Sequence, residues 1–289
     1  MTIYRSLKGK EVILSQYDQN WNALGLETED RYLPTRYGKT HVVVSGPVDG
    51  PPIVVFHGGN MISPISFAWI TQLTQRYRIY APDTVGHPGY SAENRLKPGT
   101  FQYGEWAADV IDGLGLDRPV VMGGSYGAGI LLNLAAYAPQ KIGKAVLVVP
   151  SGFAPPPLLP LIRKIGFPMM MYQVTRQRSW LIRSLSAMYP EPSENVIEIT
   201  GAVYKHLYLE AEMPRSIQDG ELKDFHAPTL ILAAENDILF LPATVIRRAR
   251  EVIPNLVTAE VIAGSSHFLP ERVWGSLCDR IDQFIQQGK

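Results

Sequence analysis

The stretch VVMGGSYGAGILL, residues 120–132, runs from an apolar segment through glycines and a single serine into a second apolar segment. A β-branched run that leads directly into a helix-like run predicts a strand, a sharp turn and a helix. Small residues are needed on both sides of Ser125, because bulkier ones would clash with the flanking strand and helix. We therefore expect the Ser125 hydroxyl to stand exposed at the carboxyl edge of a sheet. The backbone N–H of Tyr126 should be free at a helix N-terminus.

The pattern Gly-x-Ser-x-Gly is weak evidence alone, since it should occur by chance in roughly one chain in ten of this length. The apolar strand before it and the apolar helix after it make it informative. The alternative is an ordinary glycine-rich turn that binds a phosphate. Neither the Gly-x-Gly-x-x-Gly nor the Gly-Lys-Ser/Thr pattern fits this turn, which disfavours that alternative.

Further β-branched runs alternate along the chain with longer helical patterns. Near-continuous apolar strands of this kind are buried on both faces, which is typical of a parallel sheet, and the stretches between them suit crossover helices. The expected strands lie at 41–46, 52–58, 77–83, 119–125, 144–150, 228–237 and 257–265, and the expected helices at 8–24, 101–116, 241–253 and 271–285.

The alternation stops between Ser151 and Phe225, where a proline cluster is followed by helix-like segments. We therefore expect an α/β core made of residues 1–150 and 226–289, with residues 151–225 inserted as a helical cap. The second half of this insert is rich in acidic residues, so the two halves could face one another, or the first half could bind an anion. The first half has no acidic residue and contains Arg163, Lys164, Arg176, Arg178 and Arg183.

Composition excludes several classes of function. The 289 residues include 27 basic and 27 acidic side chains, which leaves no overall field to concentrate nucleic acid or an anionic membrane. No segment has the apolar length of a signal peptide or a membrane span, so we expect a cytoplasmic protein. The single Cys278 excludes an internal disulfide and is expected to be buried. No cluster has metal-ligand spacing, and we expect neither metal nor cofactor.

A serine hydroxyl is a poor nucleophile near neutral pH, and it needs an imidazole to take its proton and a carboxylate to orient that imidazole. Asp237 follows one expected strand and His267 follows the next, and the order Ser125, Asp237, His267 matches this arrangement. Glu235 is the alternative acid, although it lies earlier on its strand. The histidines without a strand-end position, expected to be structural, are His41, His206 and His226.

The stretch FHGGNM, residues 56–61, should supply the second donor to a developing oxyanion. Glycines let the backbone approach a substrate closely, so the Gly59 N–H is the candidate that would act with the Tyr126 N–H, and Asn60 is the reserve. We expect His57 to orient this loop by hydrogen bonding. In the stretch APDTVGHPGYS (81–91), Asp83 and His87 are expected to fix their own loop.

The motifs HGG, GGSYG, AAEND and GSSH occur in this order, and with them the chain resembles the α/β-hydrolase superfamily over about residues 29–287, apart from the insert. With RYLPTRYGKTHVVVSGPVDGPPIVVFHG (31–58), it is similar to bacterial carboxylesterases of the naproxen-esterase type. The resemblance implies a mostly parallel, eight-stranded sheet flanked by helices, with a helical lid. It gives Ser125, Asp237 and His267 the roles of nucleophile, acid and base.

Two departures accompany the resemblance. The loop is HGGN, not the HGGG of the hormone-sensitive-lipase-like group, and Gly124 stands where many relatives have histidine or another side chain. Superfamily members that open epoxides or remove halide have aspartate at the position of Ser125, which argues against both reactions here.

Together these residues predict a serine hydrolase that cleaves esters of small, largely apolar molecules through an acyl-serine intermediate. The alternatives are a ligand-sensing protein with slow turnover, and a carbon–carbon hydrolase or perhydrolase that uses the same three residues. Adaptable side chains of the insert could line the substrate pocket or simply pack on the core. The candidates for that lining are Asn60, Phe153, Leu158, Met169, Met170 and Met171.

Overall fold

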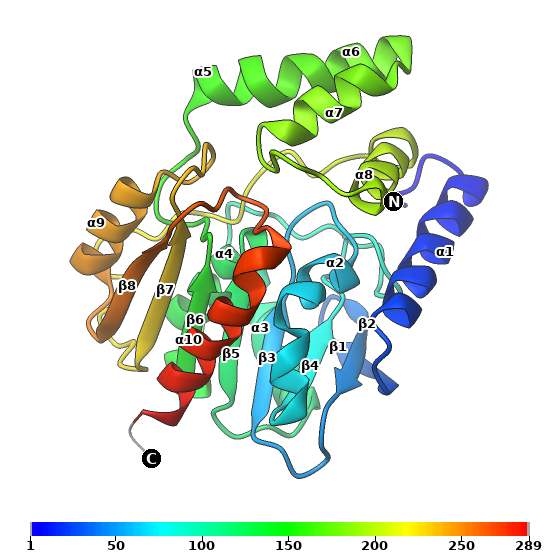
Figure 1. Cartoon of the computed structure of the whole chain (residues 1–289). Helices are drawn as coiled ribbons and strands as arrows, with labels where there is room; N and C mark the ends of the chain where they lie inside the picture. Colours follow the sequence, from blue (N-terminus) through cyan, green and yellow to red (C-terminus); the bar gives the residue numbers. More distant parts are fainter. Residues whose placement is uncertain (1, 288–289) are drawn as a thin grey trace.

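One eight-stranded sheet with helices on both faces forms the body of the protein in a computed structural model that describes residues 2–287 (Figure 1). The strand order is β1-β2-β4-β3-β5-β6-β7-β8. β2 pairs antiparallel with both β1 and β4, and the remaining neighbours are parallel. The strands are β1 (Thr28–Thr35), β2 (Gly38–Ser45), β3 (Pro52–Phe56), β4 (Arg78–Pro82), β5 (Val120–Gly124), β6 (Lys144–Val148), β7 (Thr229–Ala234) and β8 (Leu256–Ile262).

Successive side chains of the central strands point to opposite faces of the sheet, which gives the protein two apolar layers. Ile53 and Val55 of β3 face the layer that contains α1, α2, η1 and α10. Val54 and Phe56 face the layer that contains α3, α4 and α9. These helices are α1 (Leu7–Ala23), α2 (Ser63–Phe67), η1 (Ala68–Gln75), α3 (Gln102–Gly113), α4 (Tyr126–Tyr137), α9 (Pro242–Val252) and α10 (Trp274–Gln286); short 3₁₀ turns η2 (Pro139–Lys141) and η4 (Glu271–Val273) precede β6 and α10.

All seven strands expected from the sequence are present, and four expected helices correspond to α1, α3, α9 and α10. The sheet is mostly parallel, as expected, but the expectation that these strands are buried on both faces is wrong for β8. β2 is antiparallel, and β8 is only half-buried because nothing pairs with its outer edge. β1 was not expected from the sequence, because its residues TEDRYLPT form an exposed edge strand without an apolar run. Cys278 is buried, as predicted.

Between β6 and β7 the described chain forms helices and loops, which we call the inserted segment (151–225). Its first helices lie above the sheet in Figure 1, and α8 packs against α1. Near the N-terminus, Tyr4 forms a bridge with Leu207, the residue that follows α8. The helices are α5 (Leu158–Leu161), η3 (Ile162–Gly166, a π turn), α6 (Phe167–Thr175), α7 (Arg178–Ser186) and α8 (Glu194–His206).

Helices of the two halves of the inserted segment pack together, as one of the two expectations had it: α8 contacts α6 and α7. Arg178 and Glu194 form the ion pair that joins its basic and acidic halves among the described residues. The other paired acids bind outside the basic half: Glu210 pairs with Arg95 of the core at 3.5 Å, Asp219 with Arg248 at 2.6 Å and Glu221 with Arg215 at 2.7 Å. The two halves therefore face one another but share one ion pair among the described residues, and most basic side chains of the first half stay exposed at the surface.

Two features are absent from residues 2–287. No helix in this range is both long enough and apolar enough to cross a membrane. No group of three or more His, Cys, Asp and Glu side chains in the same range could hold a metal ion.

Candidate active site

Ser125 lies on the sharp turn between β5 and α4. Its backbone has φ 51° and ψ −114°, a strained conformation for a residue with a side chain. The turn is possible because its neighbours are glycines: a Cβ at Gly123 would collide with the backbone of Gly127, and a Cβ at Gly127 with that of Phe56. The strain presents a partly exposed hydroxyl at the carboxyl end of β5.

Three side chains from three loops meet at this edge of the sheet. The Ser125 hydroxyl lies 2.9 Å from Nε2 of His267, and Nδ1 of His267 lies 2.8 Å from Oδ2 of Asp237. Asp237 follows β7 and His267 follows β8, and these strands lie on the same side of β5 in the sheet. The parallel register brings their carboxyl ends together. We call Ser125, Asp237 and His267 the candidate triad.

The surroundings of Asp237 fix the direction of each hydrogen bond. Its Oδ1 accepts the backbone N–H groups of Leu239 at 2.8 Å and Phe240 at 3.1 Å, and the residue is buried. Its Oδ2 is left to accept the Nδ1–H of His267. The lone pair of Nε2 then faces the Ser125 hydroxyl, which is the tautomer that can take a proton from it.

Ser151 is a residue of this site that sequence reasoning missed. Its hydroxyl donates to the carbonyl oxygen of Ser125 at 2.9 Å, and its backbone N–H donates to the same oxygen at 3.3 Å. Ser151 is fully buried and follows Val149, a β-branched residue held at φ 42°. The loop after β6 therefore stabilises the strained turn through these two hydrogen bonds. The signal in the sequence was a small polar residue after a buried strand, which is too common to single out.

The two predicted oxyanion donors lie next to one another. A Cβ added to Gly59 would stand 2.7 Å from Cδ2 of Tyr126, so only glycine lets the loop after β3 approach so closely. No hydrogen bond between described residues uses the N–H of Gly59 or of Tyr126. The N–H of Asn60, the reserve candidate, instead donates to Nδ1 of His87 at 3.2 Å.

A buried hydrogen-bond chain links the Tyr126 side chain to the backbone of Asn60, the residue after Gly59. The Tyr126 hydroxyl donates to that of Tyr103 at 2.8 Å, and the Tyr103 oxygen lies 3.4 Å from Nε2 of His87. Because His87 Nδ1 accepts from Asn60, the ring must be neutral, with its proton on Nε2. Burial holds the pKa of His87 well below its usual value, with smaller contributions from His57 and Arg95. The loop-fixing role predicted for His87 is confirmed.

His57 also fixes its loop, as predicted. Its Nδ1 donates to the Gly58 carbonyl at 2.8 Å, and its Nε2 accepts the N–H of Thr84 at 3.0 Å. Burial lowers the pKa of His57, which keeps Nε2 available as an acceptor. His57 is fully engaged in these bonds and does not face Ser125.

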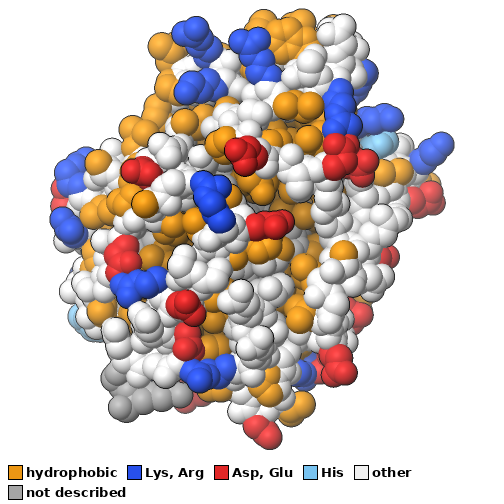
Figure 2. Space-filling model, viewed as in Figure 1, with side chains coloured by type: hydrophobic (Ala, Val, Ile, Leu, Met, Phe, Trp, Pro, Cys, Tyr) orange, Lys and Arg blue, Asp and Glu red, His pale blue; other side chains and the backbone are white. Residues whose placement is uncertain are grey.

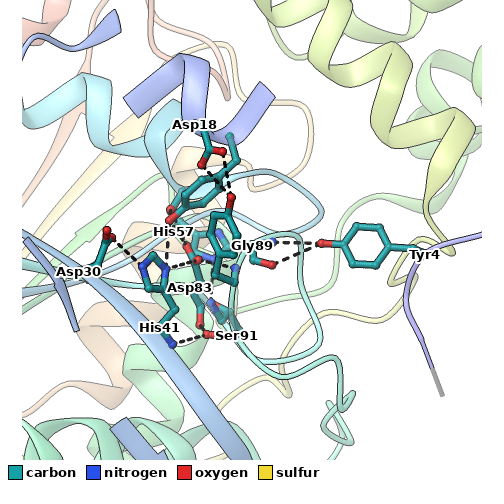
Figure 3. Close-up of polar contacts among 12 residues, drawn as sticks. Tyr4, Asp18, Asp30, His41, His57, Asp83, Gly89 and Ser91 are labelled. Carbon is teal, nitrogen blue, oxygen red and sulfur yellow. Dashed lines mark hydrogen bonds and ion pairs between the residues drawn. The ribbon is translucent and has the colours of Figure 1, made fainter. Parts of the chain in front are cut away.

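A second buried Asp–His pair joins β2 to the loop after β4 (Figure 3). Nδ1 of His41 is 2.9 Å from Oδ2 of Asp83, and its Nε2 is 2.8 Å from Oδ1 of the exposed Asp30. Asp83 also accepts from the hydroxyls of Tyr17 at 3.0 Å and Ser63 at 2.7 Å. Its bond from the Tyr90 N–H, at 2.9 Å, confirms the predicted loop-fixing role of Asp83.

Burial alone would lower the pKa of His41 and is the largest single influence. The hydrogen bonds and charges of Asp83 and Asp30 together outweigh it, and the pKa is raised. Both ring nitrogens of His41 face a carboxylate oxygen, an arrangement that suits an imidazolium and leaves no lone pair to offer. The structural role predicted for it is confirmed.

Comparison with known proteins agrees with this architecture. A model of the alpha/beta hydrolase fold matches residues 51–193. The chain is 26% identical over 286 residues to carboxylesterase YbfK of Bacillus subtilis, covering 92% of this chain and 93% of that protein. The crystal structure of naproxen esterase from Bacillus subtilis superposes with a TM-score of 0.80 at 24% identity, covering 94% of this chain and 98% of that one.

The chain has the α/β-hydrolase fold. It is also similar to haloalkane dehalogenase 2 of Mycobacterium tuberculosis, at 27% identity over 277 residues, covering 87% of this chain and 94% of that protein. In this α/β-hydrolase the fold and the mixed, mostly parallel sheet agree with the expectation from sequence.

The six predicted pocket residues of this α/β-hydrolase lie in different environments. Phe153 is buried in the layer with α3 and α4, and Met169 packs against the other layer. Leu158 and Met170 are exposed, and Met171 is half-buried. The Asn60 side chain forms two hydrogen bonds of 2.7 Å with the backbone of Glu210. Their pocket role stays a prediction, and the exposed pair is the least suited to enclose a ligand.

Proposed function

We propose that this protein is a serine hydrolase that cleaves carboxylic esters through an acyl-serine intermediate. The observation that supports this most is the continuous bonding from Ser125 through His267 to Asp237, at 2.9 and 2.8 Å. Its carboxylesterase relatives are consistent with it.

The reaction begins when the Ser125 hydroxyl attacks the ester carbonyl and His267 Nε2 takes its proton. Negative charge grows on the carbonyl oxygen, where the N–H groups of Gly59 and Tyr126 can donate to it. His267 then returns the proton to the leaving alcohol, and an acyl-serine remains. Water, deprotonated by the same imidazole, attacks the acyl carbon and releases the acid.

The surroundings of the candidate triad favour small, largely apolar substrates. The rings of Phe240 and Phe268 flank that of His267, with centroids 5.5 and 6.1 Å away. Trp69 lies beside Phe268, and a Cβ built on Gly124 would be 3.8 Å from its ring. Gly124 thus leaves space between Ser125 and these aromatic rings. An apolar acyl or alcohol group of the substrate could bind there at little cost in hydration.

Dehalogenation is the activity that one relative's name suggests, and the chemistry of Ser125 argues against it here. Attack of a serine hydroxyl on a haloalkane carbon would displace halide and leave an ether. Water does not cleave such an ether under mild conditions, so the enzyme would be consumed after one turnover. An acyl group on the same oxygen forms an ester, which a water activated by His267 can hydrolyse.

The test is turnover of short p-nitrophenyl esters by the wild type and by Ser125→Ala. Such a change should cost about 10⁴-fold or more in kcat, while the thermal unfolding curve stays the same. Ser15→Ala, which makes the same change at an exposed serine of α1, is the matched control. Tight ester binding without turnover by the wild type would indicate a sensing protein. Activity in Ser125→Ala within tenfold of the wild type would refute the assignment.

A further inference from the structure

An exposed apolar stripe follows the continuous helix formed by α5, η3 and α6. Among the described residues, six of the fourteen exposed large hydrophobic side chains lie in these three elements. Leu159 and Val174, near its two ends, are each 76% exposed. The stripe consists of Leu158, Leu159, Ile162, Phe167, Met170 and Val174. Side chains of this size ordinarily cover a core or meet a partner.

The π turn keeps these side chains on one side of the helix. The steps from Phe167 to Met170 and then to Val174 are three and four residues, one α-helical turn each. The step from Ile162 to Phe167 is five residues. In an α-helix this step would turn Phe167 away from the other side chains of the stripe, but in the wider π turn η3 it corresponds to about one turn. On the opposite side, Ile165 and Pro168 are buried. The stripe is thus one face of an amphipathic helix whose other face is anchored.

The charge around the stripe is of one sign. Residues 151–190 contain no acidic side chain. Arg163 and Lys164 are exposed in η3, and Arg176 follows α6. Within the part of the chain that the structure describes, none of these three forms an ion pair. In Figure 2 the top of the molecule, where Figure 1 places α5 and α6, shows hydrophobic and basic side chains side by side.

We infer that this face docks onto an anionic phospholipid surface. A lipid bilayer accepts aliphatic side chains in its acyl region and basic side chains at its headgroups, which matches both features of the face. A second copy of the chain fits less well, because two like faces would oppose basic residues with no acid between them. The zero net charge of the whole sequence conceals this local asymmetry, which the bulk composition did not predict.

The docking does not depend on the proposed ester hydrolysis, and its test measures binding alone. Flotation with vesicles of phosphatidylcholine and phosphatidylglycerol is compared with flotation on phosphatidylcholine alone, at low and high salt. We expect the wild type to float with the anionic vesicles, and to float less with neutral vesicles or in high salt.

Two double variants separate the apolar and the basic contribution. Leu159→Ser with Val174→Ser, and Arg163→Gln with Lys164→Gln, should each lower the vesicle partition coefficient about tenfold or more. The matched controls lie elsewhere on the surface: Val48→Ser with Val257→Ser, and Lys8→Gln with Lys223→Gln, all exposed positions. These controls should bind as the wild type does, and thermal unfolding shows that each variant is folded.

Three results would overturn the inference. The wild type could fail to float with anionic vesicles, or both test variants could float as well as their controls. Alternatively, sedimentation could show a wild-type dimer that Leu159→Ser with Val174→Ser dissociates, which would assign the stripe to a second copy of the chain.

Discussion

The molecule contains two buried Asp–His pairs that look alike at their Nδ1 atoms and differ at Nε2. In each, a buried aspartate lies within 2.9 Å of Nδ1, and a serine hydroxyl belongs to the same cluster. Around His267 that hydroxyl, from Ser125, faces Nε2. Around His41 the hydroxyl, from Ser63, donates to the aspartate instead, and a second carboxylate occupies Nε2.

This difference shows that an Asp–His pair is not in itself a base. An imidazole held by one carboxylate has a lone pair to offer, whereas one held by two carboxylates is stabilised as a cation. The first arrangement suits proton transfer. The second fastens α1 and the loop after β4 to the sheet through Tyr17 and Asp83 (Figure 3).

Replacing each histidine by glutamine should give the largest difference between the two Asp–His pairs. His267→Gln removes the base and should lower kcat/KM on p-nitrophenyl esters about 10⁴- to 10⁶-fold. His41→Gln should leave kcat/KM within tenfold of the wild type, because His41 does not contact the candidate triad. Steady-state kinetics of both purified variants, with thermal unfolding as the check on folding, decides this. Equal loss of activity in both variants would contradict it.

Asp237 and Asp83 should differ in the same way, Asp237 through its effect on kcat and Asp83 through its effect on stability. Asp237→Asn should lower kcat about 10⁴-fold, because the imidazole is no longer held in the right tautomer. Asp83→Asn should instead lower the free energy of unfolding by about 3 kcal/mol, since it leaves the buried His41 cation with a weaker partner. Denaturant unfolding and ester kinetics, run on both variants, give the four values. A large stability loss in Asp237→Asn with little change in kcat would reverse the assignment.

His87 is a third kind of buried histidine, neutral and used as an acceptor. His87→Ala leaves the Asn60 N–H without a partner and should loosen the Gly59 loop, lowering kcat roughly ten- to a hundredfold with KM little changed. His87→Asn places an amide oxygen near the position of Nδ1 and should recover most of the loss. If the two variants have the same kcat, the hydrogen bond to Asn60 does not position the loop.

The pH dependence of stability gives the smallest effect. The folded pKa of His41 is raised, so its contribution to stability is fully present below its unfolded pKa and is lost as pH rises through the folded value. The free energy of unfolding should therefore fall more steeply in the wild type than in His41→Gln as the pH rises above about 6.5, the ordinary pKa of histidine. Parallel curves for the two proteins would show that His41 is not charged between Asp83 and Asp30.

Sequence alone sufficed where a local pattern sets the geometry. The glycines around Ser125 force the sharp turn, and the carboxyl ends of neighbouring parallel strands must meet, which is why Asp237 and His267 could be chosen among several acids and histidines. Strand β1 was missed because an exposed edge has no apolar run.

What sequence could not provide are contacts between distant segments. Nothing near Ser151 indicates that its hydroxyl holds the carbonyl of Ser125, and nothing near His87 indicates that it meets Tyr103 and Asn60. Apart from Asn60, the pocket residues were chosen for being apolar in the inserted segment. Their burial depends on how the helices pack, and the structure leaves Leu158 and Met170 exposed while it buries Phe153.

Labelling with a fluorophosphonate, followed by peptide mapping, tests the central claim most directly. The reagent reacts with a serine hydroxyl only where a neighbouring base removes the proton, so it compares Ser125 and Ser63 in one molecule. We predict modification at Ser125 alone, abolished in His267→Gln and retained in His41→Gln. Modification of Ser63, or undiminished labelling of Ser125 in His267→Gln, would contradict the account.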